Sequence, residues 1–248
     1  MTRKRRIIII SASIASFIAI ILIAIMVGVG IYLGTYYHAQ DDEIDAFLEV
    51  SDVEIREIDK NTVAFVPNNP RAGFIFYPGG KVEVDSYYPL MAECAKYGIL
   101  SVAVEMPFNL AVFNINGANG IREEFPEIKS WYIGGHSLGG SMAASYLEKN
   151  KDDFDGLILL GSYSTADFSD SDLKVISIYG ENDGVMNREK YEEYKSNLPS
   201  YFSEIVIDGG NHAGFGMYGT QKGDGVSEIS QKEQISTTAI VISDFIGE

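Results

Sequence analysis

A strand, a very tight turn and a helix follow one another directly over residues 131–144, Trp-Tyr-Ile-Gly-Gly-His-Ser-Leu-Gly-Gly-Ser-Met-Ala-Ala. The turn from Gly135 to Gly139 has the pattern G-x-S-x-G. Such an elbow holds Ser137 in a strained conformation with its hydroxyl beyond the strand tip, and a Cβ on either glycine would collide with the neighbouring chain. The alternative is an ordinary glycine-rich turn. The apolar strand before it and the small, helix-forming residues after it favour the elbow.

Around this elbow, continuous apolar segments alternate with helical segments. Strands are predicted over 72–77, 99–104, 156–160, 173–179 and 202–207, and helices over 87–97, 115–125 (a weaker pattern), 188–197 and 231–246. A hairpin of residues 53–58 and 62–66 is predicted before them. Continuous apolar strands that alternate with helices predict an α/β fold, with a mostly parallel central sheet covered by helices on both faces.

The N-terminus has a different composition. Residues 3–6 are Arg-Lys-Arg-Arg, and no charged residue occurs from Ile7 to Leu33. This stretch is longer than the apolar part of a secretory signal and long enough to span a bilayer. The basic cluster is expected to stay in the cytoplasm, which places the rest of the chain outside. An unusually long, cleaved signal peptide is the alternative.

Four segments are therefore expected. They are a cytoplasmic basic tail (1–6), a transmembrane signal anchor (7–34), a linker (35–52) and a globular domain (53–248). Within the linker, residues 41–51 could instead form a first helix.

The charge distribution narrows the classes of partner. After residue 40 the chain carries 15 basic and 35 acidic residues, a net charge of −20. Such a surface should repel nucleic acid and anionic lipid headgroups, and it suits neutral or cationic small molecules. Cys94 is the single cysteine, so no intramolecular disulfide can form, and no cysteine or histidine cluster has metal-ligand spacing. We predict no metal and no organic cofactor, and the sequence does not indicate an oligomeric state.

A serine nucleophile needs a base. The chain has three histidines. His38 is expected at the membrane edge, and His136 lies inside the elbow with its backbone directed away from the nucleophile. His212 remains, in a glycine-rich loop directly after the last strand, and is the predicted base.

The base needs an acid to orient it, in the chain order Ser, Asp, His. Asp183 follows a strand between the other two and is the predicted acid, because loops at this strand edge carry function in such sheets. Glu181 in the same loop and Asp167 after the preceding strand are alternatives.

Two backbone N–H groups should stabilise an oxyanion. One is that of Leu138, at the start of the helix after the elbow. The second is expected in the loop after residues 72–77, at Gly80, with Lys81 as the alternative.

Four motifs carry a family resemblance. They are Tyr77-Pro-Gly-Gly-Lys-Val82, Met106-Pro-Phe-Asn-Leu-Ala-Val-Phe113, Gly134-Gly-His-Ser-Leu-Gly-Gly140 and Ile178-Tyr-Gly-Glu-Asn-Asp-Gly184. From about Val53 to its end the chain resembles the alpha/beta-hydrolase superfamily, and within it the compact bacterial hydrolases akin to dienelactone hydrolases. By this resemblance Ser137, Asp183 and His212 match the family triad.

The chain departs from the dienelactone hydrolases proper in one respect, since they use a cysteine nucleophile where this elbow has serine. The short segment between Gly161 and Leu173 leaves no room for the helical cap of many relatives, which predicts an open, shallow pocket. We expect a serine hydrolase of carboxylic esters. The same triad could serve an acyltransferase, a thioesterase or a peptidase, and the fold could also be a non-catalytic binding module.

Overall fold

The computed structural model describes the backbone of residues 3–247 and the side chains of residues 16–247. It contains two compact units, and the boundary between them in the chain falls between Tyr36 and Tyr37. The first unit is helix α1 (Arg3–Gly34), and its stretch Ser16–Gly34 has a mean hydropathy of 2.7. By length and composition this helix can cross a membrane. The side chains of the basic cluster 3–6 and of the first part of the expected anchor lie outside the described residues.

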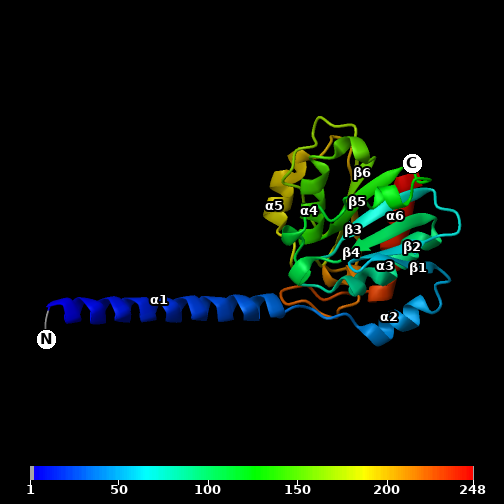
Figure 1. Cartoon of the computed structure of the whole chain (residues 1–248). Helices are drawn as coiled ribbons and strands as arrows, with labels where there is room; N and C mark the ends of the chain where they lie inside the picture. The colour runs from blue at the N-terminus through cyan, green and yellow to red at the C-terminus, as the bar shows by residue number, and fades with distance from the viewer. Residues whose placement is uncertain (1–2, 248) are drawn as a thin grey trace. The chain divides into compact units, whose positions relative to one another are not determined.

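The second unit is built on one eight-stranded sheet (Figure 1), with the strand order β1-β2-β4-β3-β5-β6-β7-β8. Neighbouring strands from β4 to β8 pair in parallel, and the hairpin β1–β2 adds two antiparallel strands at one edge. The mostly parallel sheet and the hairpin agree with the prediction from the sequence. The strands are β1 (Glu54–Asp59), β2 (Thr62–Val66), β3 (Ala72–Tyr77), β4 (Ile99–Val104), β5 (Trp131–His136), β6 (Gly156–Leu160), β7 (Lys174–Gly180) and β8 (Ser203–Ile207).

Helices cover both faces of the sheet. Helices α3 (Tyr88–Lys96) and α6 (Gln231–Gly247) contribute to one apolar cluster, and α4 (Leu138–Leu147) contributes to the other. Strands β3 to β6 are buried along their whole length, because side chains on both of their faces enter one of these clusters. Helix α5 (Arg188–Tyr194) follows β7, and its Tyr191 is buried with its hydroxyl on Ser177 Oγ.

The segment 35–52, for which a linker is expected, is folded onto this unit from Tyr37 onward. Tyr37 forms an isolated parallel bridge with Val82. Helix α2 (Asp41–Leu48) then buries Ile44 in the cluster that also contains α3, with Phe47 and Leu48 packed against it. The amphipathic pattern of this short segment explains why it packs instead of extending as a linker.

The helix predicted over 115–125 is wrong. Within this stretch the structure has turns and one short 3-10 segment, Arg122–Glu124. Gly120 has a φ of 82°, a left-handed conformation that an α-helix does not contain, and Gly117 weakens helix formation further. Residues 107–121 therefore form an irregular surface loop that follows β4.

Candidate active site

Ser137 joins β5 to α4 in a strained backbone conformation, with φ of 51° and ψ of −121°. The strain is held in place by neighbours. The Ser137 N–H donates to the Leu160 carbonyl at 2.9 Å, and the Ser137 carbonyl accepts from Ser162 Oγ at 2.7 Å. A Cβ at Gly139 would overlap the carbonyl oxygens of Tyr77 and Pro78. The tight turn that the sequence predicts is therefore present, and a strained polar residue at a strand tip is a feature of functional sites.

The predicted oxyanion donors lie next to each other. Leu138 is the first residue of α4, so its N–H has no partner within the helix. Gly80 packs on Leu138, since a Cβ at Gly80 would lie 2.9 Å from Leu138 Cδ2. The flanking N–H groups are occupied, because Gly79 donates to the Tyr87 hydroxyl and Lys81 donates to the Asn109 carbonyl at 2.6 Å. This geometry favours Gly80 over Lys81 as the second donor.

His212 and Asp183 form a buried pair. His212 Nδ1 lies 2.8 Å from Asp183 Oδ2, and both side chains are almost completely excluded from solvent. Asp183 Oδ1 accepts from the N–H groups of Val185 and Met186. Burial alone would raise the pKa of Asp183, but the hydrogen bond with His212 and the two N–H donors outweigh it and hold the pKa below its usual value. Asp183 is therefore an anionic acceptor, which fixes the His212 ring with Nδ1 as the donor.

The alternative acids do not reach His212. Glu181 Oε2 accepts from the Gly209 N–H at 3.0 Å, and so stabilises the turn after β8. Asp167 is exposed and accepts from the N–H and the hydroxyl of Ser169. Of the three candidate acids, the structure brings only Asp183 to the imidazole.

The His212 ring also lies against the elbow. Its centroid is 4.4 Å from that of His136, the residue before Ser137. Among the described side chains, His212 Nε2 is buried without a hydrogen-bond partner. A buried polar atom without a partner is unusual, and catalytic hydrogen bonds are often long or absent in structures without substrate.

His136 and Tyr87 form a contact that sequence reasoning missed. The Tyr87 hydroxyl accepts from the Gly79 N–H at 3.2 Å and lies 2.8 Å from His136 Nδ1. Burial, followed by the nearby His212, lowers the pKa of His136 well below its usual value, so the ring is neutral. Tyr87 therefore links the oxyanion loop to the elbow. The partners are 49 residues apart in the chain, and no local pattern reports such a pair.

Asp224 is a second residue that sequence reasoning missed. Its carboxylate accepts from the N–H groups of His212 and Ala213, at 3.2 Å and 2.8 Å. On the other side of the same loop, buried Gln234 of α6 exchanges hydrogen bonds with the backbone of Asn211. These contacts hold the His212 loop from both sides. In the sequence, the signal that could have indicated this role is that Asp224 is an acidic residue only twelve positions after the predicted base.

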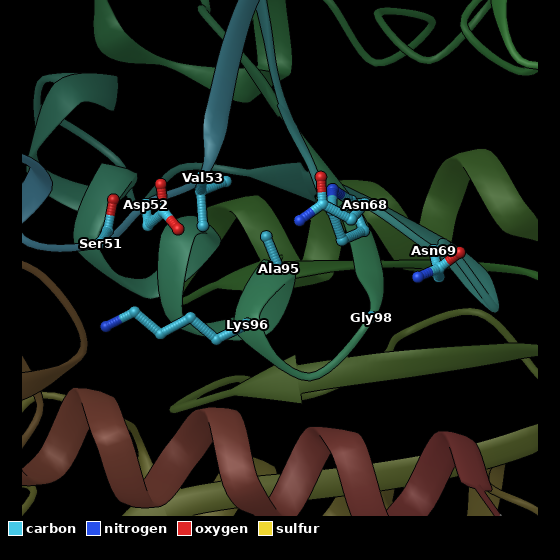
Figure 2. Close-up of a pocket in the computed structure, with 9 residues that line it drawn as sticks. Ser51, Asp52, Val53, Asn68, Asn69, Ala95, Lys96 and Gly98 are labelled. Carbon is cyan, nitrogen blue, oxygen red and sulfur yellow. The ribbon is translucent and has the colours of Figure 1, made fainter.

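A cavity of about 340 Å³ lies elsewhere, beside the end of α3 (Figure 2). Its lining includes Asn69 and Gly98, which precede β3 and β4, so it lies at the strand edge opposite to that of Ser137. Lys96 in the lining pairs with Glu93 at 2.6 Å. None of the predicted site residues borders this cavity.

The profile of the alpha/beta hydrolase family matches residues 73–236. This range covers more than half of the chain and contains the elbow, Asp183 and His212. The chain belongs to the alpha/beta hydrolase family. A sequence search of curated proteins gave no match.

Solved structures support the same fold for this alpha/beta hydrolase. TT1662 from Thermus thermophilus aligns with a TM-score of 0.57 at 11% identity, over 79% of this chain and 99% of that one. Est1E from Butyrivibrio proteoclasticus has a TM-score of 0.57, 12% identity and the same coverage. Dienelactone hydrolase from Anabaena variabilis has a TM-score of 0.55 and 12% identity, over 79% of this chain and 95% of that one. At identities this low, the alignments show a similarity of fold only.

Proposed function

We propose that this alpha/beta hydrolase is a serine hydrolase of carboxylic esters, with Ser137 as nucleophile, His212 as base and Asp183 as orienting acid. The observation that carries the proposal is the buried His212–Asp183 pair beside a strained serine at a strand tip. A neutral imidazole held by a carboxylate is the arrangement that removes a proton from serine. The names of two structural neighbours, Est1E and dienelactone hydrolase, point to ester chemistry as well.

In the proposed mechanism, His212 Nε2 takes the proton of Ser137 while Ser137 Oγ attacks the ester carbonyl. Asp183 stabilises the imidazolium that forms. The N–H groups of Leu138 and Gly80 donate to the oxyanion of the tetrahedral intermediate. The imidazolium then protonates the leaving alcohol, and His212 activates a water molecule that hydrolyses the acyl-enzyme. This chemistry uses side chains and backbone alone and calls on no metal or organic cofactor.

We further propose that α1 is a signal anchor and that the hydrolase domain lies outside the cytoplasm. Support comes from the uncharged stretch of the sequence, the hydropathy of Ser16–Gly34 and the basic residues before it. The anchored protein should fractionate with membranes and keep its first residues. Mature membrane protein that begins near residue 35–40 would show a cleaved signal peptide instead.

Labelling with a fluorophosphonate probe tests the catalytic proposal. The full chain in detergent should be labelled, because only an activated serine reacts rapidly with this reagent. Labelling should be abolished by Ser137→Ala and His212→Ala, and slowed by Asp183→Asn on the order of 10³–10⁴-fold, because the amide stabilises the wrong imidazole tautomer.

Ser169→Ala is the matched control, since Ser169 is an exposed serine whose hydroxyl donates to Asp167. It should be labelled like the wild type. A folded wild type that is not labelled would contradict the hydrolase proposal and favour a binding module. Labelling that survives Ser137→Ala would mean that another serine is the nucleophile.

A further inference from the structure

The loop that follows β4 has an unusual surface. No charged residue occurs from Met106 to Ile121, although the chain beyond residue 40 has a net charge of −20. Within it, the side chains of Phe108 and Phe113 are 57% and 56% exposed, and Val112 is also exposed. The two phenyl rings contact each other edge to face, with centroids 5.7 Å apart. We call Phe108, Val112 and Phe113 the aromatic surface.

The backbone of this loop is strained. Phe108 and Asn109 have φ values of 57° and 55°, which place two successive non-glycine residues in the left-handed region. A bulky residue there is unfavourable, by on the order of 1–3 kcal/mol. The strain maintains an exposed phenyl ring that contributes to neither buried apolar cluster. Folding alone therefore does not explain the conformation of Phe108.

The loop adjoins the candidate oxyanion site. The Asn109 carbonyl accepts from the Lys81 N–H at 2.6 Å, directly after Gly80. A Cβ on Gly80 would lie 3.7 Å from Leu110 Cδ2 and 2.9 Å from Leu138 Cδ2, so both leucines adjoin Gly80. The aromatic surface therefore begins one residue from the groups that line the site of Ser137.

The first residue of the hydrolase domain pairs with the loop after β3, which itself contacts the loop after β4. The Tyr37 N–H donates to the Lys81 carbonyl at 2.7 Å, and the Glu83 N–H donates to the Tyr37 carbonyl at 3.1 Å. Only Thr35 and Tyr36 join Tyr37 to the last residue of α1. The backbone of Lys81 therefore pairs with the first residue of the domain and with Asn109, the residue after Phe108.

We propose that the aromatic surface contacts the lipid bilayer, and that the substrate is an ester presented by that bilayer. The inference rests on the proposed function for its substrate and its anchor. An uncharged surface with exposed phenyl rings fits the apolar part of a bilayer, and aromatic side chains favour the membrane interface. The net charge of the domain selects zwitterionic or neutral lipid over anionic lipid.

Quenching by brominated lipid tests the contact without catalysis. The full chain carrying Ser137→Ala is placed in phosphatidylcholine vesicles, with and without brominated phosphatidylcholine, and Phe113→Trp is added. The indole introduced at position 113 should lose most of its added emission to the brominated lipid. Trp131, the native tryptophan, is 2% exposed and supplies an equal background in every sample.

Tyr201→Trp is the matched control. Tyr201 is 59% exposed and precedes β8, at the strand edge opposite to the elbow. An indole there should not be quenched. Equal quenching at positions 113 and 201, or none at either, would overturn the proposal. The indole at position 113 could also have equally low emission in vesicles with and without brominated lipid. That result would indicate contact with a protein partner, and it would overturn the proposal as well.

A second measurement tests the substrate. The full chain with Phe108→Ser and Phe113→Ser should hydrolyse a diacylglycerol in zwitterionic vesicles about tenfold more slowly or worse, since two apolar anchors are lost. Hydrolysis of a short soluble ester should stay within about twofold of the wild type. Equal losses on both esters would overturn the proposal. Failure of fluorophosphonate labelling would instead count against the hydrolase function, because the quenching result does not depend on it.

Discussion

The rings of His136 and His212 lie 4.4 Å apart in the interior of the candidate site. His136 stays neutral because burial and the neighbouring His212 both lower its pKa. Its Nδ1 shares a hydrogen bond of 2.8 Å with the Tyr87 hydroxyl. A neutral neighbour matters for the proposed mechanism, since His212 becomes positively charged during acyl transfer. Two charged imidazoles at this separation would repel each other strongly.

This buried histidine predicts a pH-dependent stability. As the pH falls below about 6.5, the unfolded chain binds a proton at position 136 before the folded protein does, because the folded-state pKa is lowered. The stability contributed by neutral His136 is therefore present above pH 6.5 and is lost as the pH falls toward the folded-state pKa. Between pH 6.5 and 5.5 this loss should be about 1 kcal/mol.

Urea unfolding of residues 37–248 at both pH values measures this effect. His136→Gln keeps a side chain that can hydrogen-bond to Tyr87 but cannot be protonated, so its free energy of unfolding should fall less than that of the wild type. The same decrease in both proteins would show that His136 is not the group that responds. Asp183 does not interfere in this range, because its lowered pKa places its contribution at more acidic pH.

At the scale of single residues, Ser137, Asp183 and His212 could be proposed from the sequence, since each lies in the turn or loop after a recognisable strand. The sequence left Glu181 and Asp167 open because an acidic residue in a turn has no pattern that reports its partner. The choice follows from one hydrogen bond, between Asp183 and His212. The Tyr87–His136 contact could not be predicted, because it depends on how the segment before α3 lies against the end of β5.

At the scale of elements, the elbow depends on the close approach of α4 to β3. A Cβ at Gly139 would overlap the carbonyl oxygens of Tyr77 and Pro78, and neither backbone atom can move without displacing β3. Gly139→Ala should therefore destabilise the domain by on the order of 2–4 kcal/mol, as overpacking of a rigid site does. It should also reduce probe labelling, because the proposed oxyanion donors, the N–H groups of Leu138 and Gly80, would move apart.

Thermal unfolding and labelling of Gly139→Ala check this prediction. Ser145→Ala is the control on the same helix, since Ser145 Oγ donates a hydrogen bond to the Ser141 carbonyl one turn earlier in that helix. It should unfold near the wild-type temperature. A stable and fully labelled Gly139→Ala variant would contradict the steric account of the elbow.

The elements themselves were largely predictable. The apolar stretches at 72–77, 99–104 and 156–160 coincide with β3, β4 and β6, because strands buried on both faces leave a continuous apolar signal. The stretch at 115–125 misled the prediction. Its apolar residues recur every three or four positions, as in a helix, although Gly117 and Gly120 favour an irregular loop. That loop is the one beside the candidate oxyanion site.

At the scale of the whole domain, the sequence predicted the sheet but placed the start of the domain too late. Residues 37–40 pair through backbone groups with two loops of the candidate site. Tyr37 pairs with Lys81 and Glu83, and the Gln40 N–H donates to the Met217 carbonyl at 3.0 Å. The Tyr37 hydroxyl also accepts from the Lys222 N–H. Backbone pairing of this kind has almost no side-chain pattern, so the sequence could not reveal it.

A comparison of two soluble domains tests the role of this segment. Residues 41–248 lack these hydrogen bonds and should be less stable than residues 37–248, by roughly 2–5 kcal/mol. The shorter protein should also be labelled more slowly, because the loops that carry Gly80 and His212 lose a shared support. Equal urea midpoints and labelling rates would show that residues 37–40 only connect the domain to the preceding helix.

The contact between Gly80, Leu110 and Leu138 has a consequence for the divergence of this family. Two loops and the start of α4 meet here although they are distant in the chain, and a Cβ at position 80 would contact the side chains of both Leu110 and Leu138. Substitutions at these positions cannot be accepted independently. Homologous sequences should therefore show covariation, with a larger residue at position 80 accompanied by smaller ones at positions 110 and 138.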